Sequence, residues 1–88
     1  SERFNELFMK MMENCSKDLI VNLEQLEFID SKGISTFLIG KKVLAKNGYM
    51  LIISNPPRSV RKVLDITFLN KVIPIYDDIS EVPGIVPS

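Results

Sequence analysis

The segment ISTFLIGKKVLAKNGYMLIISNPP, residues 34–57, has the pattern of a helix that stops at a turn and is followed by a buried strand. We expect the helix to span roughly residues 32–46, with Asn47 and Gly48 as its C-terminal stop. Apolar residues recur at helical spacing, which predicts a core-facing side made of Ile34, Phe37, Leu38, Leu44 and Ala45.

A strand and a further helix follow this helix. Residues 49–54 form a short, nearly unbroken apolar run, which is typical of a strand covered on both faces. Asn55 is expected to cap a helix over about residues 57–66, with Pro56 in its first turn. Spacing predicts that Val60, Val63 and Leu64 of this helix face inward. Its basic residues Arg58, Arg61 and Lys62 are expected to be solvated.

Toward the N-terminus, the sequence predicts a helix, a strand and an irregular crossing. Residues 2–14 have the apolar spacing of an amphipathic helix, and Cys15 continues its apolar stripe as a buried, unreactive thiol. Residues 18–23 have the pattern of a strand covered on both faces. The chain then crosses the surface, and we expect Leu26 and Phe28 to turn inward.

Toward the C-terminus, residues 71–76 have the pattern of a last strand. Pro74 cannot donate a hydrogen bond to a neighbouring strand, so we place this strand at the edge of the sheet. Asp78 and Glu81 have the spacing of a capping box, which predicts a short final helix. Pro83 stops that helix, and residues 83–88 are expected to be an irregular tail.

The alternation of helices and strands predicts an α/β fold. Parallel strands joined by right-handed helical crossovers are the usual outcome of such an order, so we expect a short, mainly parallel sheet packed with helices. With 88 residues, the chain is expected to form a single domain over residues 1–88.

The composition excludes several classes of function. Eleven Lys and Arg balance eleven Asp and Glu, so nothing favours a nucleic-acid or anionic-membrane surface. The chain has no His and one Cys, which excludes a Ser-His-Asp triad, a Cys-His pair and a thiolate or imidazole zinc site. No paired-acid constellation points to an enzyme, a metal or a cofactor. One cysteine and no apolar run near ~20 residues predict a cytoplasmic protein.

The tetrapeptide Asp30-Ser31-Lys32-Gly33 lies where the crossing meets the N-terminus of the helix over residues 32–46. Ser31 is expected to be its N-cap, because a serine hydroxyl accepts from a free amide of the first turn. The same free amides and the positive end of the helix dipole favour a phosphate. Phosphorylation would add about −1.5 to −2 charges beside Asp30 and repel an acidic or apolar partner. Capping without regulation is the alternative, and these residues alone leave it open.

Residues 19–81 resemble the STAS domain shared by anti-sigma-factor antagonists. That family carries the motif D-S-[ST]-G-[LI] at the start of a helix, and here the motif stands as Asp30-Ser31-Lys32-Gly33-Ile34. Further along, relatives have an N-P turn and a basic helix that ends V-L-[DE]-[LIM]-T-G-L. This chain has Asn55-Pro56, and then VLDITFL over residues 63–69.

The resemblance implies a phosphorylation-controlled binding protein. The serine that would be phosphorylated is Ser31, and the modifying enzyme would be an anti-sigma factor that is itself a serine kinase. The unphosphorylated form would bind this anti-sigma factor and free the sigma factor, and a phosphatase would reset the switch. Asp30 would orient Ser31 or help the kinase to recognise it, and Gly33 would let the backbone approach closely. Nucleotide and magnesium belong to the kinase, so the resemblance implies no cofactor for this chain.

Three features depart from the family pattern. Lys32 replaces the usual Ser or Thr, and would either pair with a phosphoserine or alter kinase specificity. Phe68 replaces the usual Gly of T-G-L, which indicates different packing or a new surface contact. Relatives usually begin with two strands, whereas this chain starts at the helix. Either the sequence is a fragment, or another element, such as a second copy in a homodimer, protects the sheet edge.

The partner surface is expected to include the residues of the motif, Asp30, Ser31, Lys32 and Gly33. It also includes Ile39 and Val43, which lie four residues apart opposite the predicted core face and just beyond Ser31. A slightly rotated helix that buries both is equally compatible with the pattern. The alternative function is a STAS subunit or scaffold domain of an anion or lipid transporter, which needs no phosphorylation of Ser31.

Overall fold

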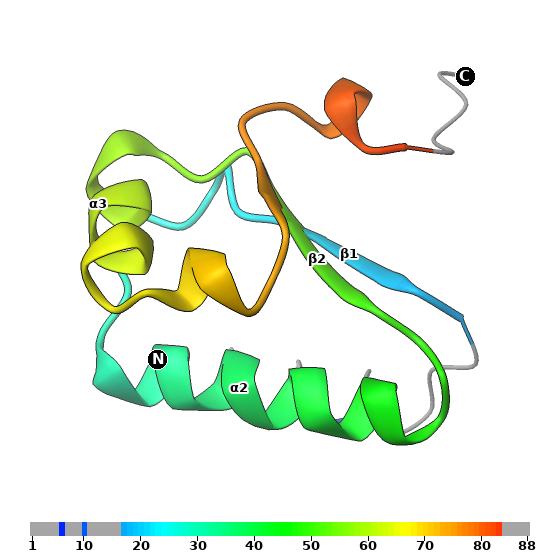
Figure 1. Ribbon diagram of the computed structural model, residues 1–88. Coiled ribbons are helices and arrows are strands. Elements are labelled where there is room, and N and C mark those ends of the chain that lie inside the picture. Colours follow the sequence, from blue (N-terminus) through cyan, green and yellow to red (C-terminus); the bar gives the residue numbers. More distant parts are fainter. Residues whose placement is uncertain (1–5, 7–9, 11–16, 84–88) are drawn as a thin grey trace.

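A computed structural model describes residues 6, 10 and 17–83 of the chain. Three parallel strands form one sheet in the order β1-β2-β3, and two α-helices pack against it (Figure 1). The strands are β1 (Leu19–Asn22), β2 (Leu51–Ser54) and β3 (Ile75–Tyr76). The helices are α2 (Ser31–Lys46) and α3 (Arg58–Ile66), with the 3-10 turns η1 (Leu69–Lys71) and η2 (Ile79–Glu81). This architecture confirms the predicted α/β fold and its parallel sheet.

The helix predicted over residues 2–14 lies mostly outside the described residues, as does Cys15. Within that range the structure describes Glu6 and Lys10, and both are helical and exposed. Two charged, exposed positions four residues apart fit the polar side of the amphipathic helix that the spacing predicts.

The core lies between one face of the sheet and the two helices. Figure 1 shows α2 and α3 on one side of the strands and η2 on the other. Side chains alternate between the two faces of a strand, and the residues packed into the core follow that alternation: Leu19, Val21, Leu51, Ile53 and Ile75. From the helices, this face is covered by fully buried side chains of Phe37, Leu44, Val60 and Leu64. Burial of such a side chain contributes about 1.5–3 kcal/mol to folding.

Helix α2 is rotated relative to its predicted orientation. Leu38 and Ala45 are exposed rather than buried, whereas Val43 is half-buried and packs against the core. The buried stripe passes instead through small residues, Gly33, Thr36 and Gly40, together with Ile34, Phe37 and Leu44. Small residues let the helix approach its neighbours closely, and the Thr36 hydroxyl is satisfied because it donates to the Lys32 carbonyl at 2.9 Å. The apolar pattern alone does not predict that these small residues are buried.

Two predictions for the chain between the regular elements are wrong. Phe28 is 70% exposed instead of turned inward, although Leu26 does pack against the core. Asn55 does not cap α3, whose N-cap is Pro57 without a side-chain hydrogen bond. The Asn55 backbone is left-handed, with φ 55°, and its side-chain oxygen accepts from the Ile79 amide at 3.0 Å. Asn55 therefore ties the end of β2 to η2.

The C-terminal elements follow the predictions in kind but differ in length. The last strand has two residues rather than six, because Lys71 belongs to η1 and residues 72–73 form a turn and a bend. Among the described strands β3 pairs only with β2, so it is an edge strand, as Pro74 predicts. The capping box is confirmed: Asp78 accepts from the Ser80 amide at 2.9 Å, and Glu81 accepts from the Asp78 amide at 3.0 Å.

Replacement of Ser54 by alanine is expected to raise the free energy of unfolding by about 1 kcal/mol. Ser54 is 0% exposed, and its hydroxyl has no hydrogen-bond partner in the part of the chain that the structure describes. Ser59→Ala is the control, because the Ser59 hydroxyl is exposed and donates to the Glu27 carbonyl at 3.0 Å. Urea unfolding of both variants tests this, and a loss of stability in Ser54→Ala would contradict it.

Candidate functional site

The site begins at the N-terminus of α2, where Asp30 rather than Ser31 is the N-cap. Asp30 has an extended backbone, and its carboxylate accepts from the Gly33 amide at 2.9 Å. Its carbonyl accepts the first helical hydrogen bond, from the Ile34 amide, at 3.0 Å. Both Asp and Ser are good capping residues, so the sequence does not separate them. The prediction that Ser31 caps the helix is wrong, and Ser31 is its first helical residue.

This shift leaves the Ser31 hydroxyl accessible. Ser31 is exposed, and its hydroxyl makes no hydrogen bond among the described residues. It stands on the first turn of a 16-residue helix, where the dipole is positive, and directly after a carboxylate. An exposed hydroxyl without a competing hydrogen bond can enter the active site of a modifying enzyme. The geometry is therefore compatible with Ser31 as a phosphoryl acceptor.

The Asp30 carboxylate is held ionised by its capping role. The hydrogen bond from the Gly33 backbone amide lowers the pKa of Asp30 below its ordinary value. A carboxyl whose pKa is lowered by folding adds stability at pH values above its unfolded pKa. That stability is lost as the pH falls through the folded pKa.

Asp30→Asn is expected to make the melting temperature less sensitive to acid. Asparagine caps a helix about as well as aspartate, but it does not titrate. From neutral pH down to about pH 4 the two proteins should melt alike, and below that the wild type should lose more stability than the variant. Thermal melts from pH 7 to pH 2 measure this. Asp78→Asn is a matched variant, because a hydrogen bond from the Ser80 amide likewise lowers the pKa of Asp78. Parallel melting curves for wild type and Asp30→Asn would refute the expectation.

Gly33 has a packing role that the sequence does not reveal. It is buried, and a Cβ at this position would lie 2.8 Å from Cγ1 of Ile29. Ile29 is itself partly buried against the core. Gly33 therefore leaves room for Ile29 to pack over the first turn of α2, and this packing fixes the position of Asp30 and Ser31.

The exposed face of α2 starts at Ser31 and runs the length of the helix. Its residues recur at helical spacing and are Ser31, Ser35, Leu38, Ile39 and Lys42. Of the two apolar residues predicted to bind a partner, Ile39 is on this face and is 47% exposed, whereas Val43 packs against the core. Leu38 is also on this face and is 38% exposed, although the spacing predicts it in the core. The sequence offered a signal for its exposure: Phe37, Leu38 and Ile39 are consecutive apolar residues, and they span too wide an arc of the helix for all three to face the core.

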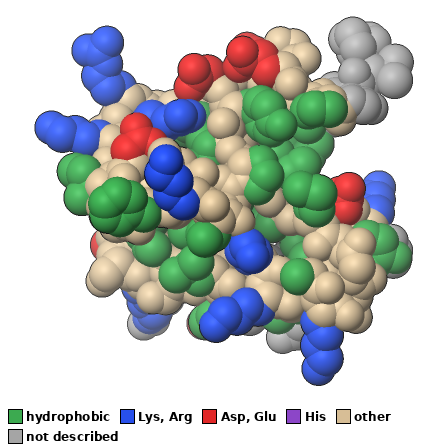
Figure 2. Space-filling model, in the orientation of Figure 1, with side chains coloured by type: hydrophobic (Ala, Val, Ile, Leu, Met, Phe, Trp, Pro, Cys, Tyr) green, Lys and Arg blue, Asp and Glu red, His purple; other side chains and the backbone are tan. Residues whose placement is uncertain are grey.

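Of the departures from the family pattern, Lys32 is exposed and directly follows Ser31. On α3, Arg58 and Lys62 are exposed. These two side chains are solvated as predicted, whereas Arg61 is half-buried and pairs with two carboxylates, Asp65 at 3.3 Å and Asp77 at 3.2 Å. Figure 2 shows Lys and Arg side chains scattered over one face of the molecule among acidic and hydrophobic ones.

Phe68 lies after the end of α3 in a left-handed conformation, with φ 61° and ψ 20°. Its side chain is 68% exposed, so little burial offsets the cost of this conformation. For an L-residue that cost is roughly 1–2 kcal/mol, and glycine avoids it. Glycine is the residue that this left-handed backbone favours.

Phe68→Gly is expected to raise the free energy of unfolding by about 1 kcal/mol, because it relieves this strain. Phe68→Ala is the control, since it removes the ring and keeps the strained backbone. Urea unfolding should show a higher free energy of unfolding for the glycine variant alone. Equal stabilities of the glycine and alanine variants would show that the left-handed backbone costs little.

Among residues 6, 10 and 17–83, no three His, Cys, Asp or Glu residues are grouped as a metal site would need. No helix formed by those residues is long and apolar enough to cross a membrane.

Comparison with known proteins identifies the family. The model of the STAS domain matches residues 1–82. Over 62 residues the chain is 37% identical to an anti-sigma F factor antagonist of Paenibacillus polymyxa, and the match covers 68% of this chain and 51% of that protein. The chain therefore spans about half the length of that curated relative.

Solved structures agree with this match. The crystal structure of TM1081 from Thermotoga maritima, a candidate anti-sigma factor antagonist, superposes with a TM-score of 0.79 at 26% identity. The superposition covers 91% of this chain and 69% of that one. The NMR structure of TM1081 gives a TM-score of 0.72 at 25% identity, covering 92% of this chain and 66% of that one. Because the family model matches nearly the whole sequence, this chain belongs to the STAS domain family.

Proposed function

We propose that this chain is an anti-sigma-factor antagonist whose binding is switched by phosphorylation of Ser31. The observation that carries the proposal is the exposed Ser31 hydroxyl, which makes no hydrogen bond among the described residues and follows the capping Asp30. The names of the relatives from Paenibacillus polymyxa and Thermotoga maritima support it. The chain acts by binding, in the cytoplasm, and is not itself an enzyme.

The partner is an anti-sigma factor with serine kinase activity. It docks on the exposed face of α2 of this chain. Ser31, Asp30 and Lys32 meet the kinase at the helix start. Leu38 and Ile39 supply apolar contact about two turns further along. This set revises the partner-binding residues expected from sequence, because Val43 is turned toward the core and Gly33 is buried.

Phosphorylation changes the charge at the start of this face. The kinase transfers the γ-phosphoryl group of ATP to the Ser31 oxygen, so an O–P bond forms on serine and ADP leaves. The product carries about −1.5 to −2 charges next to the ionised Asp30. A partner surface that fits a neutral hydroxyl beside one carboxylate is then repelled, and the complex dissociates. A phosphatase that hydrolyses the phosphoserine restores binding.

Incubation with the cognate anti-sigma factor, ATP and magnesium tests the proposal directly. We expect intact-mass spectrometry to show one phosphoryl group, and peptide mapping to place it on Ser31. Ser31→Ala should remain unmodified, and Ser35→Ala, which alters the next exposed serine on the same face of α2, should be modified normally. A phosphoryl group on another residue, or no complex with the unmodified chain, would overturn the proposal.

A further inference from the structure

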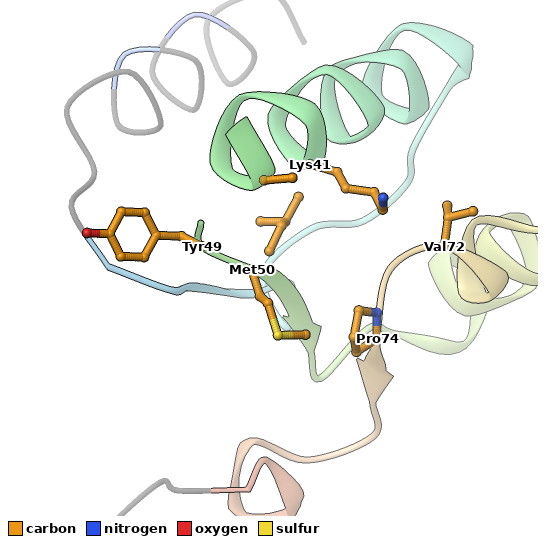
Figure 3. Close-up of a pocket in the computed structure, with 7 residues that line it drawn as sticks. Lys41, Tyr49, Met50, Val72 and Pro74 are labelled. Carbon is orange, nitrogen blue, oxygen red and sulfur yellow. The ribbon is translucent and has the colours of Figure 1, made fainter. Parts of the chain in front are cut away.

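A hollow of about 190 Å³ lies at the opposite end of α2 from Ser31. It is bounded by the C-terminal half of α2, by the residues that lead into β2 and by the chain between η1 and β3. Figure 3 shows Lys41 reaching from α2 across its upper side, Tyr49 and Met50 on one flank, and Val72 and Pro74 on the other. None of these residues belongs to the proposed switch.

The walls of the hollow present carbon to an occupant. Met50 is 51% exposed and Val72 is 46% exposed, so both have apolar surface that an occupant would cover. The polar backbone groups nearby are already used. The Met50 amide donates to Asp18 at 2.8 Å, its carbonyl accepts from Leu19 at 2.9 Å, and the Pro74 carbonyl accepts from Ile53 at 3.0 Å. The body of a ligand here must therefore be apolar.

Lys41 is the one charged side chain among the described residues that line the hollow. It is half-buried, and it forms no ion pair with a carboxylate among those residues. A lysine stem packs along apolar surface while its ammonium group seeks an acceptor. An anionic head group on the ligand would supply that acceptor.

The volume limits the size of the ligand. An apolar cavity of about 150 Å³ holds benzene, so this hollow fits an apolar body of about six to eight carbon atoms. It is smaller than the ~300–1,000 Å³ typical of sites for drug-sized ligands, which argues against a nucleotide or a flavin.

We propose that this hollow binds a small hydrophobic carboxylate, with its carbon body against Met50 and Val72 and its carboxylate on the Lys41 ammonium group. Lys41 lies ten residues beyond Ser31, or roughly 15 Å along the helix. The site is therefore separate from the phosphorylation switch, and its test needs neither a kinase nor a phosphatase.

Titration of the full chain with hexanoate, followed by NMR of ¹³C-methyl methionine, tests the site. Met50→Leu assigns the Met50 signal. We expect hexanoate to shift this signal saturably, with a Kd on the order of 1 mM. 1-Hexanol has the same chain without the charge, and should bind about tenfold more weakly. Lys41→Met should lower hexanoate affinity about tenfold and leave hexanol affinity unchanged.

Lys42→Met is the matched control, because Lys42 is adjacent to Lys41 but is exposed and does not line the hollow. It should leave both affinities unchanged. Circular dichroism verifies that each variant is folded. Three outcomes would overturn the proposal: no saturable shift of Met50, equal affinities of the wild type for hexanoate and hexanol, or equal losses in Lys41→Met and Lys42→Met.

Discussion

Phe37→Ala is expected to lower the free energy of unfolding by about 3–5 kcal/mol. The Phe37 side chain is 0% exposed and belongs to the core between α2 and the sheet. Its removal deletes a ring's worth of buried apolar surface and leaves a cavity that the fixed strands and helices fill only partly. Small domains have total stabilities near the lower end of 5–15 kcal/mol, so this single change should unfold much of the population.

The measurement for Phe37→Ala is urea unfolding followed by far-ultraviolet circular dichroism. Phe28→Ala is the matched control, because it makes the same change at a side chain that is 70% exposed. Its stability should stay within about 0.5 kcal/mol of the wild type. Similar losses in the two variants would mean that Phe37 is not the core residue that its burial indicates.

Ser31→Asp is expected to weaken binding to the anti-sigma factor by at least about 100-fold. The substitution places a second carboxylate beside Asp30, and like charges pressed into an interface cost several kcal/mol. Aspartate carries one negative charge, whereas phosphoserine carries nearly two, so the phosphorylated chain should bind more weakly still. Ser31→Ala should bind as the wild type does, but it cannot be switched off.

Loss of folding would not account for this result. A carboxylate in the first turn of α2 interacts favourably with the helix dipole, so Ser31→Asp should melt at or slightly above the wild-type temperature. Ser35→Asp is the control for charge alone, since it adds the same group one turn along the exposed face, away from Asp30. Calorimetric titration of each variant gives the affinities. A loss with Ser35→Asp as large as that with Ser31→Asp would argue against a switch at Ser31.

Local chemistry made the regular elements predictable from sequence. The apolar run over 49–54 contains β2, Asn47 and Gly48 end α2, and Asp78 with Glu81 forms the predicted capping box. Each of these signals depends on residues close together in the chain, and the interactions behind it do not require tertiary packing. Parallel pairing followed from the alternation of elements, because strands separated by a helical crossover run in the same direction.

Features decided by tertiary contacts were not predictable. The rotation of α2 depends on small residues such as Gly33, which lets Ile29 pack closely over the first turn, and hydrophobicity does not encode that approach. The choice of Asp30 over Ser31 as the cap depends on which of two suitable residues adopts the extended backbone. Asn55 has a partner 24 residues away at Ile79, which no local pattern indicates. For the candidate site, the motif located the helix start, and the structure identified which side chains there are accessible.

The parallel order of the strands also constrains how the chain folds. Strand β2 is central, and a helical crossover separates it in sequence from each of its neighbours, β1 and β3. The bond from the Met50 amide to Asp18 joins residues 32 apart, and the bond from the Ile79 amide to Asn55 joins residues 24 apart. No ladder bond of this sheet can form until a whole crossover has closed, so the entropy of loop closure must be met before the sheet contributes any enthalpy.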